Sequence, residues 1–422
     1  EDTGDWNTSK VLNDIREYNI DDCNSTQELV VWLRDQQILH KIQYLNKSDI
    51  KDPEISDEIN NRTMMRDRLL ERSKLEIGDQ SKLTENIAWA LEFHRREAKP
   101  VFWRLFDRIG LSYEDLIDDI DCLSGCVRTV REPYKPTSRS RNLAYEFRFD
   151  PDQEFKANAK SYYVVGEKDK NDNNLKVTLL PEESNLVNGL IIVTANIVLP
   201  FEISLVPDEY VHPGAIQNAI DDVVTKYENN HLENTAILDF LKRGSPRIHG
   251  RNINDTSPII NSNNSTERIN EIISTVTKLE NSYITIQGPP GAGKTYTGKH
   301  IISELVNNGM RVVISSNSHK AINNLLVGVA EHCRNKNIKV DCYCTKDTGN
   351  EISENNIQVI TNTEVINYVQ NNCVVGTTAW GFCREELAGK FDYLFIDEAG
   401  QGSVAKLIGM SRAAKNIILM GD

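Results

Sequence analysis

A glycine-rich loop at residues 288–295 constrains the fold more than any other feature of the chain. It lies within SYITIQGPPGAGKTYTGKHIISELV, residues 282–306, between an apolar segment and a segment with helical spacing. This order of strand, loop and helix, with Lys-Thr closing the loop, is typical of a phosphate-binding loop. Backbone N–H groups beside the glycines and the positive end of the following helix both attract phosphate oxygens. The sequence therefore predicts an α/β domain with a parallel sheet that binds a nucleotide.

Each side chain at the end of this loop has a predicted task. The Lys294 ammonium should reach the β- and γ-phosphates, and the Thr295 hydroxyl should bind Mg2+. A glycine turn without a ligand is the alternative, but the four fixed positions and their strand–helix context favour the nucleotide. The residues predicted to contact the nucleotide are Gly288, Gly291, Gly293, Lys294, Thr295 and Tyr296.

Two adjacent carboxylates, Asp397 and Glu398, follow the apolar run FDYLFI at residues 391–396. A buried strand that ends in acids places them at the carboxyl edge of a parallel sheet, beside the phosphate loop. There Asp397 should hold Mg2+ through its water shell, and Glu398 should orient and deprotonate the water that attacks the γ-phosphate. A solvated turn would be the alternative if the phosphate loop did not precede the pair. Gln401 is predicted to sense the γ-phosphate.

Two further loops have a composition that suits a nucleic-acid strand. They lie in RVVISSNSHKAINNLL, residues 311–326, and in NCVVGTTAWGF, residues 372–382. Small hydroxyls and amides at helix starts suit sugar-phosphate oxygens, and an aromatic ring offers a base a stacking face. Simple helix capping is the alternative. The residues predicted to contact a strand are Ser316, His319, Lys320, Thr378 and Trp380.

The net charge of −14 does not exclude a nucleic-acid partner, because it is unevenly distributed. Residues 260–422 carry 15 Lys and Arg against 16 Asp and Glu, so −13 of the net charge lies in residues 1–259. The eight cysteines show no CxxC pair, so reduced thiols are expected rather than zinc ligands. No apolar run is long enough to span a bilayer, and Glu1 begins no leader. We expect a soluble cytoplasmic protein, and an internal piece of a longer one.

Changes of pattern along the chain predict five segments. Apolar residues at helical steps predict one helix over residues 10–40. Short β-like runs separated by DPDQ, KDKNDNN and PEES predict a small barrel. The predicted segments are a first helix (1–45), a helical stalk (46–140), the small β-barrel (141–210), a stalk helix with a Ser/Asn-rich linker (211–259) and the nucleotide-binding domain (260–422).

The motifs of the last segment resemble those of superfamily 1 helicases. QGPPGAGKTYTG, SNSHKAINNLL, VVGTTAW, FDYLFIDEAGQ and ILMGD are together similar to the RecB-like nuclease–helicase family, in its five-prime-to-three-prime branch. This resemblance implies a RecA-like domain preceded by a stalk and a small barrel, with ATP and Mg2+ as cofactors. It also implies single-stranded or partly duplex DNA as the partner. Relatives place an adenine-reading glutamine before the phosphate loop, where this chain offers Thr266 or Glu267.

The N-terminal helix resembles a different activity class. EYNIDDCNSTQELVVWL, residues 17–33, is similar to the last motif of RNase H-like exonucleases. The resemblance implies that Tyr18 orients water and that Asp22 binds metal in a two-metal site. Asp22 is predicted on the apolar face of the helix, where a charge needs a partner, so pairing with a buried base is the alternative. The other carboxylates of such a site are expected before Glu1.

These features together predict part of an ATP-dependent DNA helicase joined to an RNase H-like nuclease, which unwinds duplexes in DNA processing or repair. An RNA helicase of the same branch is one alternative, because no residue reads a 2′-hydroxyl. A P-loop switch that hydrolyses ATP without moving along a strand is the other. ILMGD, residues 418–422, resembles the start of the motif that couples the acid pair to a second RecA-like domain. We therefore expect this chain alone to be inactive as a motor.

Overall fold

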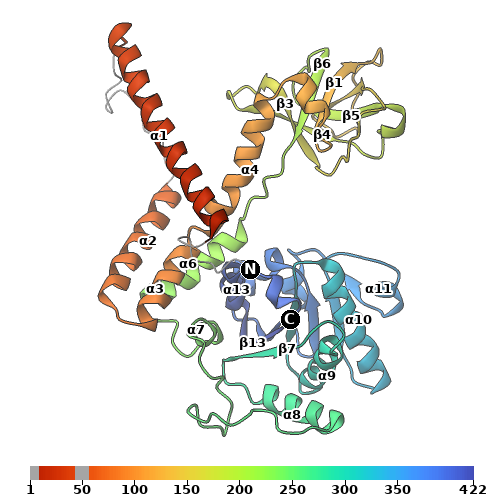
Figure 1. Cartoon of the computed structure of the whole chain (residues 1–422). Coiled ribbons are helices and arrows are strands. Elements are labelled where there is room, and N and C mark those ends of the chain that lie inside the picture. The colour runs from red at the N-terminus through yellow and green to blue at the C-terminus, as the bar shows by residue number, and fades with distance from the viewer. Residues whose placement is uncertain (1–8, 43–56) are drawn as a thin grey trace. The chain divides into compact units, whose positions relative to one another are not determined.

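The computed structural model describes residues 9–42 and 57–422, in two compact units that comprise residues 1–61 and 62–422 (Figure 1). The first unit contains α1 (Lys10–Leu39), which begins where the Ser9 hydroxyl accepts a hydrogen bond from the Leu12 N–H. The helix predicted over residues 10–40 is therefore present. No residue of α1 is buried. The apolar face of α1 thus has no core against it among the described residues.

The second unit has helices on both sides of its barrel in the sequence. These are α2 (Asp57–Leu75), α3 (Asp79–Ala90), α4 (Phe93–Gly110), the short α5 (Tyr113–Ile117), α6 (Ala215–Glu228) and α7 (Ala236–Leu241). Most of them contact the nucleotide-binding domain, whereas α5 packs on the barrel. Leu69 of α2, Ile87 of α3 and Ile220 of α6 belong to one hydrophobic core with Phe382 and Leu407. This shared core ties the stalk helices to the domain that follows them in the sequence.

Six antiparallel strands close into a barrel in the order β1-β2-β5-β4-β3-β6. They are β1 (Leu123–Arg128), β2 (Leu143–Arg148), β3 (Ser161–Lys168), β4 (Asn174–Leu179), β5 (Leu190–Ala195) and β6 (Glu202–Pro207). Phe147, Tyr162 and Leu205 fill the interior and are fully buried. The barrel begins at Leu123 rather than at 141, so the predicted helical stalk extended too far. The segment LSGCVR is short and contains a glycine, so its sequence gives only a weak indication of a strand. In the structure Gly125 adopts a positive φ of 64°.

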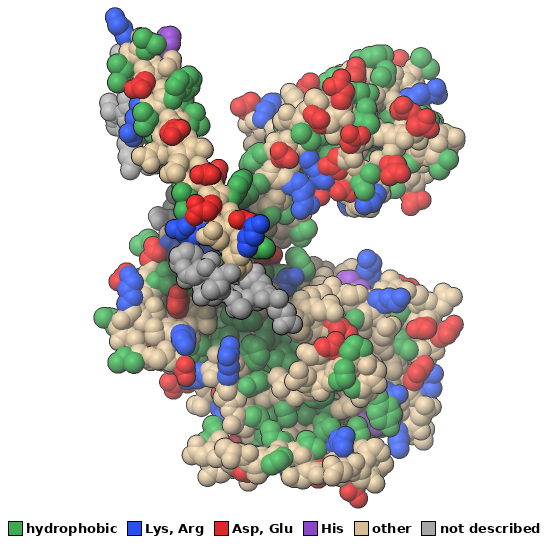
Figure 2. Space-filling model, in the orientation of Figure 1, with side chains coloured by type: hydrophobic (Ala, Val, Ile, Leu, Met, Phe, Trp, Pro, Cys, Tyr) green, Lys and Arg blue, Asp and Glu red, His purple; other side chains and the backbone are tan. Residues whose placement is uncertain are grey.

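The surface of the barrel carries both signs of charge in close alternation (Figure 2). Several opposite charges pair there, among them Arg131 with Glu146 at 2.9 Å and Lys176 with Asp208 at 2.7 Å. At its junction with α4, the buried Arg108 contacts Asp119, Asp121 and Glu209 at 2.7, 3.1 and 3.1 Å. These charges thus have other protein groups as partners.

The nucleotide-binding domain is built on a parallel seven-stranded sheet in the order β10-β9-β11-β8-β12-β13-β7, as predicted. The strands are β7 (Tyr283–Gln287), β8 (Val312–Ser315), β9 (Asp341–Cys344), β10 (Gln358–Val359), β11 (Cys373–Gly376), β12 (Phe391–Ile396) and β13 (Ala414–Gly421). The helices are α8 (Ser265–Thr277), α9 (Lys294–Asn307), α10 (His319–Asn335), α11 (Glu351–Glu354), α12 (Ala379–Phe382) and α13 (Val404–Met410).

Both faces of this sheet are buried, which explains why its strands read as continuous apolar runs. Val312 and Phe395 face the core that holds α9 and α10, whereas Val313 and Leu394 face the core that holds α6, α12 and α13. Successive residues of one strand therefore serve opposite cores. With both faces covered, polar side chains that follow the strands gather at the carboxyl edge of the sheet.

In the part of the chain that the structure describes, no helix is both long and apolar enough to cross a membrane.

Candidate functional site

The phosphate loop has the backbone that its glycines allow. Gly291 and Gly293 adopt positive φ angles of 81° and 87°, a region that side chains rarely enter. Gly293 precedes the first residue of α9, so the free N–H groups of this helix face the loop. The Gly288 N–H donates to the Gly421 carbonyl at 3.1 Å, which anchors the start of the loop to β13. The loop is therefore shaped as a cradle for an anion.

Lys294 already lies inside this cradle. Its Nζ donates to the Gly288 carbonyl at 2.5 Å and forms an ion pair with Asp422. An incoming phosphate would therefore compete with Asp422 for the ammonium. Thr295 follows on the first turn of α9. The exposed Tyr296 ring lies 4.2 Å from the His300 ring, so one of its faces is already covered.

The acid pair lies at the carboxyl end of β12, next to the loop. Asp397 is only 7% exposed, and its N–H donates to the Ser315 carbonyl at 2.9 Å. Burial raises the pKa of the Asp397 carboxyl, the hydrogen bond from the Glu398 N–H lowers it in part, and the Glu398 charge raises it. Lys294 acts in the opposite direction and lowers this pKa, which shows that loop and acid pair share one electrostatic environment. Such a carboxylate favours a cation beside it.

Glu398 and Gln401 are held in a defined arrangement. Glu398 adopts a left-handed backbone (φ 55°, ψ 42°) ahead of the short helix η5 (Ala399–Gln401). The Gln401 Nε2 donates to Glu398 Oε2 at 3.2 Å, and the Asn317 Nδ2 donates to the Gln401 carbonyl at 2.7 Å. A chain of two hydrogen bonds thus connects Glu398 to the loop that follows β8. Asn317 was not predicted as a site residue, although it lies within the polar run SSNSHK.

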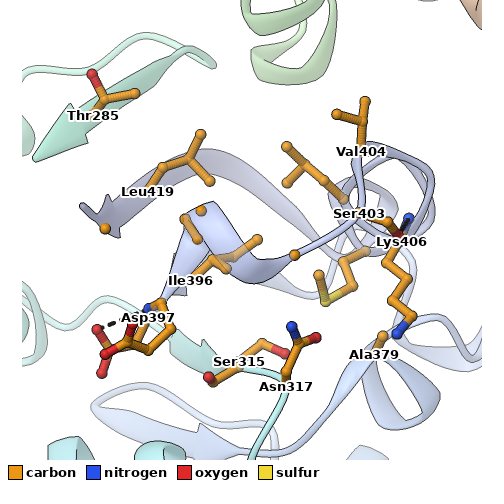
Figure 3. A pocket seen from close by; sticks show the side chains of 18 of the residues that line it. Thr285, Ser315, Asn317, Ala379, Ile396, Asp397, Ser403, Val404, Lys406 and Leu419 are labelled. Atoms are coloured by element: carbon orange, nitrogen blue, oxygen red, sulfur yellow. Dashed lines mark hydrogen bonds between the residues drawn. The ribbon is translucent and has the colours of Figure 1, made fainter. Parts of the chain in front are cut away.

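A cavity of about 390 Å³ opens at this edge of the sheet (Figure 3). Its apolar wall comes mainly from α7, β13 and α13, and its polar rim comes from the loops after β8, β11 and β12. Among its lining residues are Phe240, Ser315, Ser316, Asn317, Thr378, Trp380, Asp397, Glu398, Val404, Lys406, Leu419 and Asp422. The glycines of the phosphate loop do not line it. The cavity is therefore a space beside the nucleotide cradle, and not the cradle itself.

Three of the five residues predicted to contact a strand, Ser316, Thr378 and Trp380, line this cavity. The other two, His319 and Lys320, begin α10 at the same edge of the sheet but lie outside the cavity. The Nδ1 atom of His319 is buried and has no hydrogen-bond partner in the described residues. Burial lowers the pKa of this imidazole, and Lys346 contributes to the shift. A neutral His319 with a free ring nitrogen can accept or donate one further hydrogen bond.

Lys406 is a second residue that the sequence did not reveal. The Ser403 hydroxyl accepts from the Lys406 N–H at 3.3 Å and thereby starts α13, which puts Lys406 on the first turn of that helix. Its Nζ lies 5.6 Å from the centre of the Trp380 ring, on α12. The two residues are 26 positions apart in the sequence, and only the packing of α12 against α13 brings them together.

The exonuclease motif is not assembled into a site by the described residues. Tyr18 is 71% exposed, and Asp22 is exposed as well. Among the described residues no core lies against α1, so the role of Asp22 stays a prediction. Across residues 9–42 and 57–422, no group of three or more His, Cys, Asp or Glu side chains could hold a metal ion.

Thr266 and Glu267, which occupy the region where relatives have an adenine-reading glutamine, form hydrogen bonds at the N-terminus of α8. Asn264 caps this helix by accepting from the N–H groups of Thr266 and Glu267, and the Glu267 carboxylate accepts from the Ser262 hydroxyl at 2.9 Å. Both residues therefore have local structural partners.

Comparisons with known proteins agree with this geometry. Residues 269–422 match a family model described as AAA domain. The DNA replication ATP-dependent helicase/nuclease DNA2 of Saccharomyces cerevisiae is 31% identical over 190 residues, which cover 42% of this chain and 12% of that protein. The protein of the same name from Gallus gallus is 30% identical over 151 residues, covering 34% and 15%. The Arabidopsis thaliana helicase/nuclease JHS1 is 27% identical over 152 residues, covering 33% and 11%.

The matches thus span only about an eighth of the length of these relatives. A solved complex of arterivirus nonstructural protein 10 (helicase) with DNA covers 75% of this chain and 47% of that chain. At 12% identity and a TM-score of 0.24, it carries no structural argument.

Proposed function

We propose that this chain is part of an ATP-driven DNA motor of superfamily 1, because residues 269–422 match the AAA domain model and part of the chain is similar to ATP-dependent helicase/nucleases. In this proposal it couples ATP hydrolysis to movement along single-stranded DNA and to unwinding of a duplex. A second RecA-like domain would complete the motor, and an RNase H-like nuclease that includes Tyr18 and Asp22 would precede it.

One observation carries the proposal: a single cavity is lined both by the acid pair and by residues of the two loops that are predicted to contact a strand. The hydrogen bonds from Asn317 to Gln401 and from Gln401 to Glu398 connect the same two groups. A strand that displaces the loop after β8 would therefore move the carboxylate proposed to activate water. Neither a passive binding module nor a nucleotide switch requires such a connection.

The residues at the edge of the sheet fit Mg2+ and ATP. The hydroxyl of Thr295 and the carboxylate of Asp397 are oxygen donors of the kind Mg2+ prefers, and the glycine backbone leaves room for phosphates. These residues would hold Mg2+, which when bound neutralises charge on the β- and γ-phosphates. Lys294 would exchange Asp422 for a phosphate oxygen. Glu398 would accept the proton of the attacking water, while Gln401 fixes the orientation of that carboxylate.

The test is the release of phosphate from Mg-ATP in the presence of single-stranded DNA, RNA of the same length, or neither. It should be run on this chain and on a longer chain that adds a second RecA-like domain. We expect Mg-ATP binding by both chains and DNA-stimulated turnover by the longer one. Stronger stimulation by RNA would support an RNA helicase, and equal turnover under all three conditions would support a switch and contradict the proposal.

A further inference from the structure

We propose that the cavity beside the acid pair takes up one unstacked nucleobase, with Trp380 as its stacking surface and Lys406 as the contact to the adjoining phosphate. The inference rests on the proposed function and assigns it a residue, Lys406, and a binding mode. It is argued from the shape of the cavity, the distribution of charge along it and the exposure of its rim.

The cavity has the size and lining of a ligand site. Its volume of about 390 Å³ lies within the range of small-molecule pockets, about 300–1,000 Å³. Phe240, Leu407 and Leu419 supply apolar wall, while Ser316 and Asn317 supply a hydroxyl and an amide at the rim. A nucleobase has the same composition, because its faces are apolar and its edges carry donors and acceptors. A purely aliphatic occupant would offer no hydrogen-bonding group to the Ser316 hydroxyl at this rim.

The charges of the cavity are segregated. Asp397 lies at one end and Lys406 at the other (Figure 3). Lys406 has no carboxylate partner among the described residues, in contrast to Arg131 and Lys176 of the barrel. A phosphate at the Lys406 end would supply the missing charge, and it would lie away from the acid pair. Charge thus favours a nucleic-acid strand that enters from the Lys406 end.

The rim is open where a base would enter. Trp380 is 38% exposed and Val404 is 49% exposed, so two large apolar side chains face solvent at the mouth of the cavity. The Lys406 ammonium lies over the Trp380 ring at 5.6 Å. A base that stacks on the ring would move this cation toward the neighbouring phosphate. Stacking on aromatic side chains tolerates any base, which suits a protein that moves along a strand.

Oligonucleotides with and without bases test the proposal. Binding of an oligothymidylate is compared with that of a strand of equal length built from abasic nucleotides, at one salt concentration. Stacking of one base predicts an affinity ratio of about fivefold or more for the wild-type chain. In Trp380→Ala this ratio should approach one. The fluorescence of 2-aminopurine in the strand should be quenched by the wild type, and this quenching should be absent in Trp380→Ala.

Two matched pairs of variants separate the cavity from general effects. Val404→Trp fills the mouth and should reduce the ratio, whereas Val198→Trp, at an exposed position of the barrel region, should not. Lys406→Gln should weaken both strands, whereas the exposed Lys390→Gln, just before β12, should weaken neither. Thermal unfolding verifies that each variant is folded.

If the wild-type chain binds both strands equally well, the proposal that the cavity holds a base is wrong, although the protein still binds a strand. A protein side chain would then be the better occupant. A wild-type chain that binds neither strand would contradict the proposed function itself. Unchanged ratios in both Val404→Trp and Trp380→Ala would place the base elsewhere and overturn the assignment.

Discussion

Charged side chains differ in their partners between the barrel junction and the carboxyl edge of the parallel sheet. At the junction of α4 with the barrel, Arg108 is buried and contacts three carboxylates. At the edge of the sheet, burial raises the pKa of Asp397, and Lys406 lacks a carboxylate partner within the described residues. Buried or unpaired charge costs stability unless a ligand compensates it. The charges at the barrel junction thus serve structure, whereas those at the edge of the sheet fit the metal, the nucleotide and the strand of the proposed function.

Removal of a charge from the phosphate cradle should have the largest effect on function. Lys294→Ala should abolish nucleotide-dependent activity, because Lys294 is the side-chain cation that lies inside the loop. Glu398→Gln should leave Mg-ATP binding largely intact while hydrolysis falls by about two or more orders of magnitude, because only the base is lost. Equilibrium binding of a fluorescent nucleotide and phosphate release separate the two effects. If Glu398→Gln binds ATP no better than Lys294→Ala, this division of roles is wrong.

Removal of a charge from the barrel junction should instead unfold structure. Arg108→Ala leaves Asp119, Asp121 and Glu209 without their buried cation, and breaking such a group costs about 3–5 kcal/mol. Urea unfolding measures the loss. Arg104→Ala is the matched control, because Arg104 contacts the same Glu209 from an exposed position and should cost about 1 kcal/mol or less.

The same junction should be sensitive to acid. Burial works to raise the pKa of Asp119, but the hydrogen bonds from Arg108 and from the Asp121 N–H, together with the Arg108 charge, outweigh it and the pKa is lowered. The stability that this pair contributes is therefore present above the ordinary pKa of an aspartate and is lost as pH falls through the lowered value. Arg108→Ala should be less sensitive to acid than the wild type. Equal acid sensitivity in both would contradict the structural role of the cluster.

The same contrast explains which features the sequence could reveal. The phosphate loop and the acid pair are local in sequence, and each follows an apolar strand, so periodicity and residue type were sufficient to predict them. The Trp380–Lys406 contact and the bond from Asn317 to Gln401 join separate segments, and only the order of strands in the sheet brings them together. The first strand of the barrel escaped prediction because it is short and Gly125, a residue type that is rare in strands, interrupts it.

Removal of the Asp397 charge should stabilise the folded protein when no Mg2+ is present. Its raised pKa means that the folded state binds this proton more tightly than the unfolded state, so the contribution to stability is present at low pH and is lost as pH rises through the folded pKa. Without Mg2+, Asp397→Asn should therefore melt at a higher temperature than the wild type near pH 8. The difference should shrink toward pH 4, and hydrolysis should be lost throughout. A lower melting temperature near pH 8 would show that the carboxylate is structurally satisfied.

Among these variants, Lys320→Ala should have the smallest effect. Lys320 is exposed at the start of α10, where its ammonium can reach a strand phosphate at the carboxyl edge of the sheet. Each phosphate that a cation neutralises contributes about one unit to the slope of log affinity against log salt. Lys320→Ala should therefore weaken DNA binding for all sequences and flatten that slope by about one unit, as measured by fluorescence anisotropy over a salt series.

Lys415 provides the control for this measurement. It begins β13 at the opposite end of the sheet and lies 3.3 Å from Asp392, so its charge already has a protein partner. Lys415→Ala should leave the salt slope unchanged. If both variants flatten the slope equally, the strand is not confined to the carboxyl edge. If neither variant flattens the slope while both remain folded, Lys320 has a structural role. The cations that contact the strand are then other residues at that edge, and Lys406 is the first candidate.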